Sequence, residues 1–287
     1  MACFLAFVYW LSKNLSPTPA GPACEVRLLA HTETSGIYLT TAVAPFHTIK
    51  VSKYPAVAQR EYRIHRAIEL AFLTVAEEFG DYGVELDLPG IPKYFAFSQG
   101  HKQSPLKGYF TEILPYYESE DEHFLVKIYM GNLKPLSYGS ITGFYNRPAY
   151  PDYLYFEHID FQVLSATMGT TLAMLHWRCG VDAAGVKFVF ERESRGSTKL
   201  WLMDFSNCKM FELASQDAMM QLVDAILDNE PYWPKCINLP GLMNTWITFR
   251  TAYLKMSNLL LKDVSSDSRL RLLPLLFMDE LERIQGS

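Results

Sequence analysis

The spacing of apolar residues predicts a mixture of helices and short strands in the central part of the chain. Across residues 161–177, apolar side chains recur every three or four positions, which is typical of one face of an amphipathic helix. Gly180 is expected to end this helix. Two short apolar runs follow at 186–190 and 200–203, and the polar segment between them contains a turn sequence at Arg195. This pattern predicts a β-hairpin.

The same pattern, read over the rest of the chain, predicts an α+β fold with its strands mainly in the first half. The expected strands are 27–30, 36–43, 47–51, 94–98 and 108–114, residues 124–130 form a further apolar segment, and the further expected helices are 58–77, 214–227, 242–261 and 270–284. Segment 138–154 is rich in Tyr, Pro and Gly, so we expect it to be an irregular surface loop.

Composition and charge limit the size of the core and the kinds of partner that this chain can have. The chain has 287 residues, of which 49% are hydrophobic, so it can bury the core of one large domain or of two lobes. Its formal net charge is −5, which provides no basic footprint for nucleic acid. We therefore expect no nucleic-acid partner.

The N-terminus begins with an apolar run at residues 2–11, followed by a Pro-rich segment at 16–22. The run is shorter than the roughly 20 residues that a membrane span needs, and no Lys or Arg precedes it. We predict a hydrophobic extension over residues 1–24, no transmembrane span and a cytoplasmic location. A secretory or membrane-associated location is the alternative.

The cysteines do not predict a metal site. There are five of them, with no C-x-x-C pair, at Cys3, Cys24, Cys179, Cys208 and Cys236. A structural zinc site needs four convergent ligands, and this spacing does not supply them. We expect packed thiols in a reducing compartment.

Two acidic residues flank the predicted hairpin. Asp182 lies four residues before the first run and Asp204 directly follows the second, so a hairpin would bring both carboxylates to one end. Earlier in the chain, Lys50 on an expected strand precedes Glu61 in the next expected helix. Helix, loop with Asp, strand, turn, strand and Asp-Phe follow one another in the large lobe of protein kinases and aminoglycoside phosphotransferases.

Three stretches carry a more specific resemblance. MGTTLAMLHWRCGVDAAGVKFVF, LWLMDFSNCKMF and LVDAILDNEPYWPKC are similar to the pattern of a fungal family of unknown function that is often labelled zinc-finger protein. Glu61-Tyr62-Arg63-Ile64-His65 and the connector at Glu112 match the same pattern, which spans roughly residues 25–255. The resemblance implies a degenerate protein-kinase-like fold with two lobes, a small antiparallel β lobe at 25–118 and a larger, mainly helical lobe at 119–287.

The resemblance also implies roles for four residues. Asp182 corresponds to the catalytic-loop aspartate, and Asp204 to the aspartate that binds the magnesium ion bridging the phosphates. Lys50 and Glu61 correspond to the ion pair that positions the α- and β-phosphates. We expect these four residues to form the catalytic site.

Departures from the kinase pattern argue against ordinary phosphoryl transfer. Lys187 stands where a second metal ligand, Asn, is usual, and an ammonium cannot coordinate magnesium. Ser206 replaces the glycine of the metal-binding triad, and no G-x-G-x-x-G occurs in the first hairpin. In the family pattern, Gly185 and Lys187 both replace acidic residues.

These observations favour a small-molecule enzyme that has lost ATP chemistry. We predict a cyclase or isomerase of fungal secondary metabolism, acting on a hydrophobic substrate without a cofactor and without a metal, with His176, Lys187 and Glu112 as further pocket residues. One alternative is a phosphotransferase that uses ATP and magnesium, with Asp204 as the metal ligand. Another is a non-catalytic, pseudokinase-like interaction module. The sequence identifies neither substrate nor protein partner.

Overall fold

The computed structural model describes most of the chain outside its N-terminal segment. The described residues are 26–31, 35–40, 47–52, 54–81, 86–98, 107–112, 124–131, 147–156, 158–192, 198–213, 215, 217–229, 231–236, 242–262 and 268–286. The apolar run at 2–11, the Pro-rich segment at 16–22, Cys3 and Cys24 lie outside them.

The chain divides into two compact units. Unit 1 comprises residues 1–66 and 92–122, and unit 2 comprises residues 67–91 and 123–287. The division falls within helix α2 (Pro55–Gly80). The lobes expected at 25–118 and 119–287 stay a prediction.

Unit 1 contains a five-stranded antiparallel sheet. Its strands lie in the order β1-β2-β3-β5-β4 and are β1 (Val26–His31), β2 (Ser35–Thr40), β3 (His47–Ser52), β4 (Tyr94–Ser98) and β5 (Lys107–Glu112). All five had been expected from β-branched or apolar runs. Lys50 lies at the centre of β3, paired with Ile37 on one side and Tyr109 on the other.

Helix α2 follows β3 and has the apolar periodicity that the sequence predicts. Ile64, Ile68, Phe72 and Val75 are buried and recur every three or four residues along it. The helix begins three residues before the expected start at 58 and ends three after 77, at Gly80.

Unit 2 contains a second, four-stranded sheet. Its order is β7-β6-β8-β9, and the strands are β6 (Phe124–Ile128), β7 (Arg147–Ala149), β8 (Lys187–Arg192) and β9 (Thr198–Met203). β8 and β9 form the predicted hairpin, with Lys187 opposite Met203, and only the short β6–β7 pair is parallel. The fold is therefore a mixture of helices with small, mainly antiparallel sheets, as expected for the α+β class.

One prediction about this region is wrong. Within the segment expected to be an irregular loop or lid, 138–154, the described residues 147–154 form β7 and the start of the short helix α3 (Pro151–Phe156), and residues 138–146 lie outside the described ones. β7 pairs with β6 through backbone contacts that do not depend on alternating side chains. Leu154 on α3 is fully buried, which attaches this short helix to the core of unit 2.

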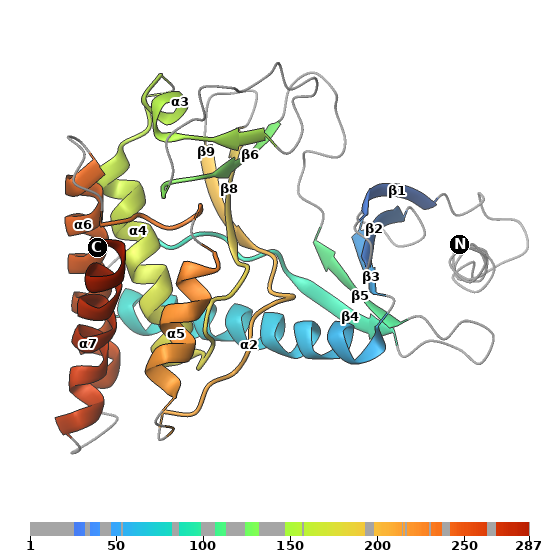
Figure 1. The fold of residues 1–287 in the computed structure, drawn as a ribbon. Coiled ribbons are helices and arrows are strands. Elements are labelled where there is room, and N and C mark those ends of the chain that lie inside the picture. Colours follow the sequence, from blue (N-terminus) through green and yellow to red (C-terminus); the bar gives the residue numbers. More distant parts are fainter. Residues whose placement is uncertain are drawn as a thin grey trace, which may run out of the picture. The chain divides into compact units, whose positions relative to one another are not determined.

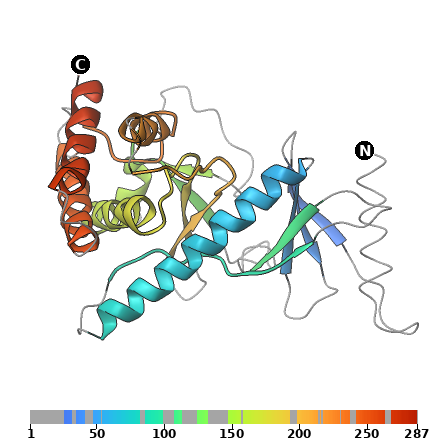
Figure 2. The same cartoon turned by 90° about the horizontal axis from the view of Figure 1, so that it is seen from below.

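Helices cover one side of the second sheet. They are α4 (Phe161–Ala173), continued by the π-helical turn η2 (Met174–Arg178), α5 (Ala218–Leu227), α6 (Leu242–Leu261) and α7 (Ser268–Gln285). Figures 1 and 2 both show α4 between the sheet and the α6–α7 pair. The core-facing residues of the sheet, Ile128, Phe188 and Leu202, are completely buried. Of the helices that the structure describes, none is long and apolar enough to cross a membrane.

Candidate functional site

Helix α4 delivers the chain to the loop that holds Asp182. Asp160 caps its N-terminus by accepting hydrogen bonds from the backbone N–H groups of Gln162 and Val163. The π-helical turn then widens the last turn, and Gly180 ends it with a φ of 66°, a left-handed conformation that glycine adopts without strain. The predicted stop at Gly180 is confirmed.

Asp182 is a structural acceptor at the base of the hairpin. Its side chain is 2% exposed. Oδ1 accepts hydrogen bonds from the backbone N–H of Ala184 at 3.1 Å and of Lys209 at 2.9 Å, and Oδ2 accepts one from Nε2 of Gln221 at 3.0 Å. Both oxygens are engaged within the protein, so Asp182 ties the loop before β8 to the loop after β9.

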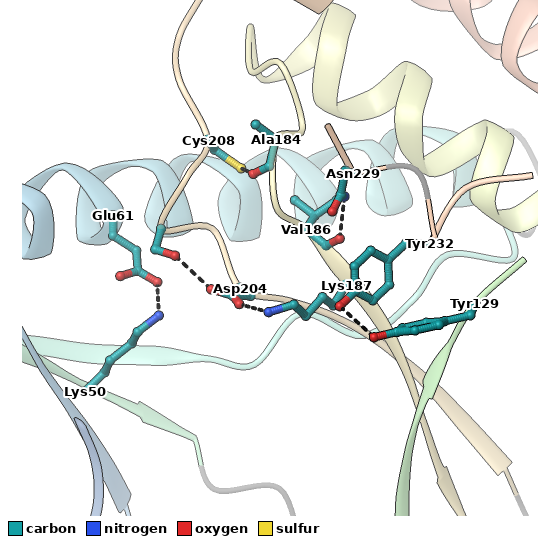
Figure 3. A network of polar contacts seen from close by, with 11 residues as sticks. Lys50, Glu61, Tyr129, Ala184, Val186, Lys187, Asp204, Cys208, Asn229 and Tyr232 are labelled. Atoms are coloured by element: carbon teal, nitrogen blue, oxygen red, sulfur yellow. Dashed lines mark hydrogen bonds and ion pairs between the residues drawn. The ribbon is translucent and has the colours of Figure 1, made fainter. Parts of the chain in front are cut away.

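Asp204 occupies a strained position directly after β9. Its φ is 68°, a left-handed conformation that costs a non-glycine residue free energy, and such positions cluster at functional sites. Oδ1 accepts a hydrogen bond from Oγ of Ser206 at 2.9 Å. Oδ2 forms an ion pair with the Lys187 ammonium, and both side chains remain partly exposed, at 29% and 26%. Figure 3 shows Lys187 extending toward Asp204.

Two tyrosines lie at the same end of the sheet. Continuing the β6–β8 register by two residues places Tyr129 opposite Lys187. Tyr129 stacks edge-on against Tyr232 with ring centroids 4.8 Å apart, and their hydroxyl groups are 3.4 Å apart (Figure 3). Burial raises the pKa of Tyr232, the hydrogen bond with Tyr129 opposes this, and the Asp204 carboxylate adds to it. The Asp204 charge therefore acts on the ionisation of the Tyr232 hydroxyl.

Backbone and amide contacts fix Tyr232 in this position. The side-chain amide of the buried Asn229 donates to the carbonyl of Val186 at 2.8 Å, next to Lys187. The backbone N–H of Gly131 donates to the carbonyl of Pro231 at 3.1 Å. The segment that follows α5 is thus attached both to the start of β8 and to the end of β6.

Lys127 completes the group of side chains around Lys187. It lies directly opposite Val189 on β8, so it is a diagonal neighbour of Lys187 on one face of the sheet. Burial, and then the Lys187 ammonium, lower the pKa of Lys127, whereas Asp204 opposes this effect. We call Lys127, Tyr129, Lys187, Asp204 and Tyr232 the sheet-end cluster.

Lys50 and Glu61 form a separate ion pair in unit 1. Nζ of Lys50 lies 2.5 Å from Oε1 of Glu61, with side-chain exposures of 17% and 3% (Figure 3). The expected pairing of these two residues is therefore present. Glu112 is the last residue of β5, where it pairs with His47.

His176, expected as a pocket residue, lies in the core of unit 2. It is 1% exposed, and its Nδ1 lies 2.9 Å from the hydroxyl of Tyr253. Burial lowers its pKa to about 3, and a contact with the backbone of Asp182 opposes this only in part. A neutral, solvent-excluded imidazole is suited to packing between Phe277 and Tyr253, whose rings it meets edge-on.

The described residues contain no group of three or more His, Cys, Asp or Glu side chains that could hold a metal ion. Cys179 and Cys208 are buried free thiols, and burial raises the pKa of Cys179 to about 12. Cys208 donates to the carbonyl of Ala184, which makes it part of the hairpin base.

Comparison with known proteins finds one matching family model and several similar solved structures. A family model described as "Zinc finger protein" matches residues 200–265, which include most of β9, Asp204 and all of α6. The predicted resemblance to a family with that label is confirmed over those residues. No curated protein matches the chain.

Two solved structures resemble the chain over most of its length. One is the crystal structure of the kinase domain PF14_0431, at 10% identity and a TM-score of 0.39, covering 91% of this chain and 89% of that one. The other is the PknI kinase domain of Mycobacterium tuberculosis, at 13% identity and a TM-score of 0.35, covering 92% and 97%. Both are described as kinase domains, and both TM-scores are low.

Sequence reasoning missed three members of the cluster. Lys127, Tyr129 and Tyr232 come from segments far apart in the sequence, and only the β6–β8 register and the contacts of Asn229 bring them to Lys187. The one available signal was the Glu-Pro-Tyr-Trp-Pro stretch after α5, which lies in one of the three stretches that carry the family resemblance.

Proposed function

We propose that the chain is a small-molecule enzyme on a degenerate, protein-kinase-like two-lobe fold that cyclises or isomerises its substrate without transferring phosphate. The observation that carries this proposal is the ion pair between Lys187 and Asp204. Asp204 matches the position at which kinases bind magnesium, and here a lysine of the same unit neutralises its carboxylate. A divalent cation would have to displace that ammonium.

The surroundings of the two aspartates support the proposal further. Magnesium prefers a nearly octahedral set of oxygen ligands, whereas the Asp204 oxygens face the Lys187 ammonium and the Ser206 hydroxyl. Asp182 is buried and accepts three hydrogen bonds, so it is poorly placed to accept a proton from a substrate hydroxyl. The donor set does not fit a metal-bound nucleotide, and the reaction proposed here includes none.

The sheet-end cluster offers the groups that proton transfer needs. The Lys187 ammonium can stabilise negative charge that develops on a substrate oxygen, and the partly exposed Asp204 carboxylate beside it can accept a proton from substrate carbon. Either hydroxyl of the Tyr129–Tyr232 pair can return a proton. Moving a double bond or closing a ring in this way leaves the mass of the substrate unchanged.

The Lys50–Glu61 pair favours one second candidate. In kinases this pair positions the nucleotide phosphates, and here it is formed at 2.5 Å. A phosphotransferase using ATP and magnesium is therefore the alternative function, in which Asp204 would have to leave Lys187.

Ligand-dependent unfolding separates the two functions. We expect magnesium and ATP together to leave the melting temperature of the wild type unchanged. A response to them is expected only in Lys187→Asn, which removes the ammonium from the Asp204 carboxylate. Lys255→Asn, on the exposed side of α6, controls for loss of a positive charge. A ligand at about 100 times its dissociation constant adds about 2.7 kcal/mol of stability. A magnesium-dependent shift of that size in the wild type, abolished by Asp204→Asn, would establish the phosphotransferase instead.

The catalytic claim needs its own assay. Unsaturated small-molecule precursors are incubated with the wild type, and products are separated by chromatography and weighed by mass spectrometry. We expect a product of unchanged mass that is lost in both Lys187→Met and Asp204→Asn, because each substitution breaks the acid–base pair. A product heavier by a phosphoryl group would contradict the proposal.

A further inference from the structure

Lys127 is a half-buried cation at the sheet-end cluster. Its neighbour across the sheet is the apolar Val189, and both the Lys187 ammonium and the Asp204 carboxylate act on its pKa. Among the described residues, no group forms a hydrogen bond or an ion pair with its side-chain ammonium. The Asp204 oxygen that could serve it is already paired with Lys187.

The charges of the cluster do not balance. The cluster holds two ammonium groups, on Lys127 and Lys187, and one carboxylate, on Asp204, which leaves one positive charge in excess. Burying a charge without a partner is unfavourable, and the lowered pKa of Lys127 agrees with that. A ligand with one negative charge would remove the imbalance.

The aromatic side chains beside Lys127 indicate what such a ligand carries. Tyr129 follows Lys127 by two residues, so both project from the same face of the strand. Tyr129 meets Tyr150 and Tyr232 edge-on, at centroid distances of 5.5 and 4.8 Å. Tyrosine rings bind flat, unsaturated groups well, and both Tyr129 and Tyr232 are partly exposed.

We propose that the sheet-end cluster binds an unsaturated monocarboxylate, with Lys127 as the ion-pair partner of the carboxylate and the Tyr129–Tyr232 pair against the unsaturated body. This inference rests on the proposed function and names the substrate class of the same site. A phosphate ester carries up to two negative charges, which is more than the single positive charge that the cluster has in excess.

Matched probes test the proposal. Cinnamate and cinnamamide have the same shape and differ in charge. Phenyl phosphate and inorganic phosphate test whether the cluster binds phosphate instead of a carboxylate. Binding is measured by calorimetry and by the melting temperature for the wild type, Lys127→Met, Lys127→Arg and the surface control Lys255→Met. We expect cinnamate to stabilise the wild type, Lys127→Arg and Lys255→Met. We expect cinnamamide to have no effect, and Lys127→Met to bind cinnamate about tenfold more weakly or worse.

A second measurement does not depend on a variant that folds. Lysines of the wild type are methylated reductively with carbon-13, and the Lys127 signal is titrated with and without cinnamate. We expect bound cinnamate to raise the pKa of Lys127, because a carboxylate partner favours the charged amine.

Four outcomes would overturn the inference: equal binding of cinnamate and cinnamamide, no binding of cinnamate, unchanged binding in a folded Lys127→Met variant, or an unshifted Lys127 titration. Tighter binding of phenyl phosphate than of cinnamate would reassign the cluster to phosphate. These results are separable from the proposed function, since a failure of carboxylate binding leaves the absence of a magnesium–ATP response intact.

Discussion

Asp182 and Asp204 have identical side chains and opposite surroundings. Asp182 is 2% exposed and accepts hydrogen bonds on both oxygens from groups of the chain itself. Asp204 is partly exposed, sits in a left-handed backbone conformation and faces a lysine. The first therefore maintains the loops around the hairpin, and the second is the partly exposed carboxylate to which we assign the acid–base role in the proposed function.

Replacing Asp182 tests this division of roles. We expect Asp182→Asn to lower the free energy of unfolding by about 2 kcal/mol, because the amide nitrogen cannot accept the bond from Gln221 and the charge that strengthens the other two is lost. Urea denaturation measures the change, with Asp224→Asn on the exposed side of α5 as control. An unchanged free energy of unfolding together with complete loss of turnover would instead make Asp182 a catalytic base.

The candidate residues could be predicted from the sequence, but most of their partners could not. The strand-to-helix spacing of Lys50 and Glu61 led to a pair that the structure contains. Lys187 departs from the kinase pattern, but its contact with Asp204 could not be predicted from the sequence. Lys187 lies opposite Met203 in the hairpin, and the contact depends on its side chain reaching the next residue, Asp204. Lys127 could not be predicted as a site residue, because nothing in its local sequence distinguishes it from a surface lysine.

At the scale of elements, the packing of α4 against α6 in unit 2 requires a glycine. A Cβ placed on Gly169 would lie 2.2 Å from the carbonyl oxygen of Phe249 and 3.0 Å from the backbone nitrogen of Tyr253. Backbone atoms of a helix cannot move aside as a side chain can. Gly169 therefore sets the distance between the two helices that hold the His176–Tyr253 contact.

Enlarging this residue should separate the helices. We expect Gly169→Ala to lower the free energy of unfolding by about 1–3 kcal/mol or more, the usual cost of overpacking a core. Gly80→Ala is the matched control, because a Cβ at the end of α2 meets nothing within 4 Å, and there we expect a change within about 1 kcal/mol. Thermal unfolding of both variants measures the difference, and equal melting temperatures would contradict the assignment.

Periodicity predicted the long elements well and the short ones poorly. The helices at α2, α4, α6 and α7 were expected within a few residues of their observed ends, because each places apolar residues on one face over several turns. β7 spans only Arg147–Ala149, and α3 spans only Pro151–Phe156. Elements of that length are too short to display a period, and β7 exists through its pairing with β6.

At the scale of the whole molecule, each unit contains a buried histidine that folding keeps neutral. In unit 1, Nε2 of His65 donates to the carbonyl of Pro92 at 2.6 Å, and burial lowers the pKa of His65 to about 4. In unit 2, burial lowers the pKa of His176 to about 3. The unfolded chain, with both values near 6.5, binds more protons than the folded chain below that pH.

Acid should therefore destabilise both units. As the pH falls below 6.5, we expect each histidine to remove about 1.4 kcal/mol of stability per pH unit, down to about pH 4 for His65 and about pH 3 for His176. His65→Gln keeps an N–H donor for Pro92 but cannot titrate, so its stability should depend less on pH in that window. His158→Asn, at an exposed histidine, is the control, and parallel pH curves for His65→Gln and the wild type would contradict the prediction.

The segment after α2 forms a short bridge to β9, at the edge of the four-stranded sheet. The backbone N–H of Gly90 donates to the carbonyl of Leu200 at 2.8 Å, and the N–H of Leu202 donates to the carbonyl of Gly90 at 2.9 Å. The Trp201 ring leaves no room for a side chain there, since a Cβ on Gly90 would meet it at 2.9 Å. An uncovered edge strand is a template onto which strands of other molecules add. Because the Gly90 bridge occupies backbone groups of Leu200 and Leu202 at this edge, we expect it to hinder intermolecular strand addition to the hairpin that carries Lys187 and Asp204. Resistance of this chain to aggregation is then expected to depend in part on one residue without a side chain.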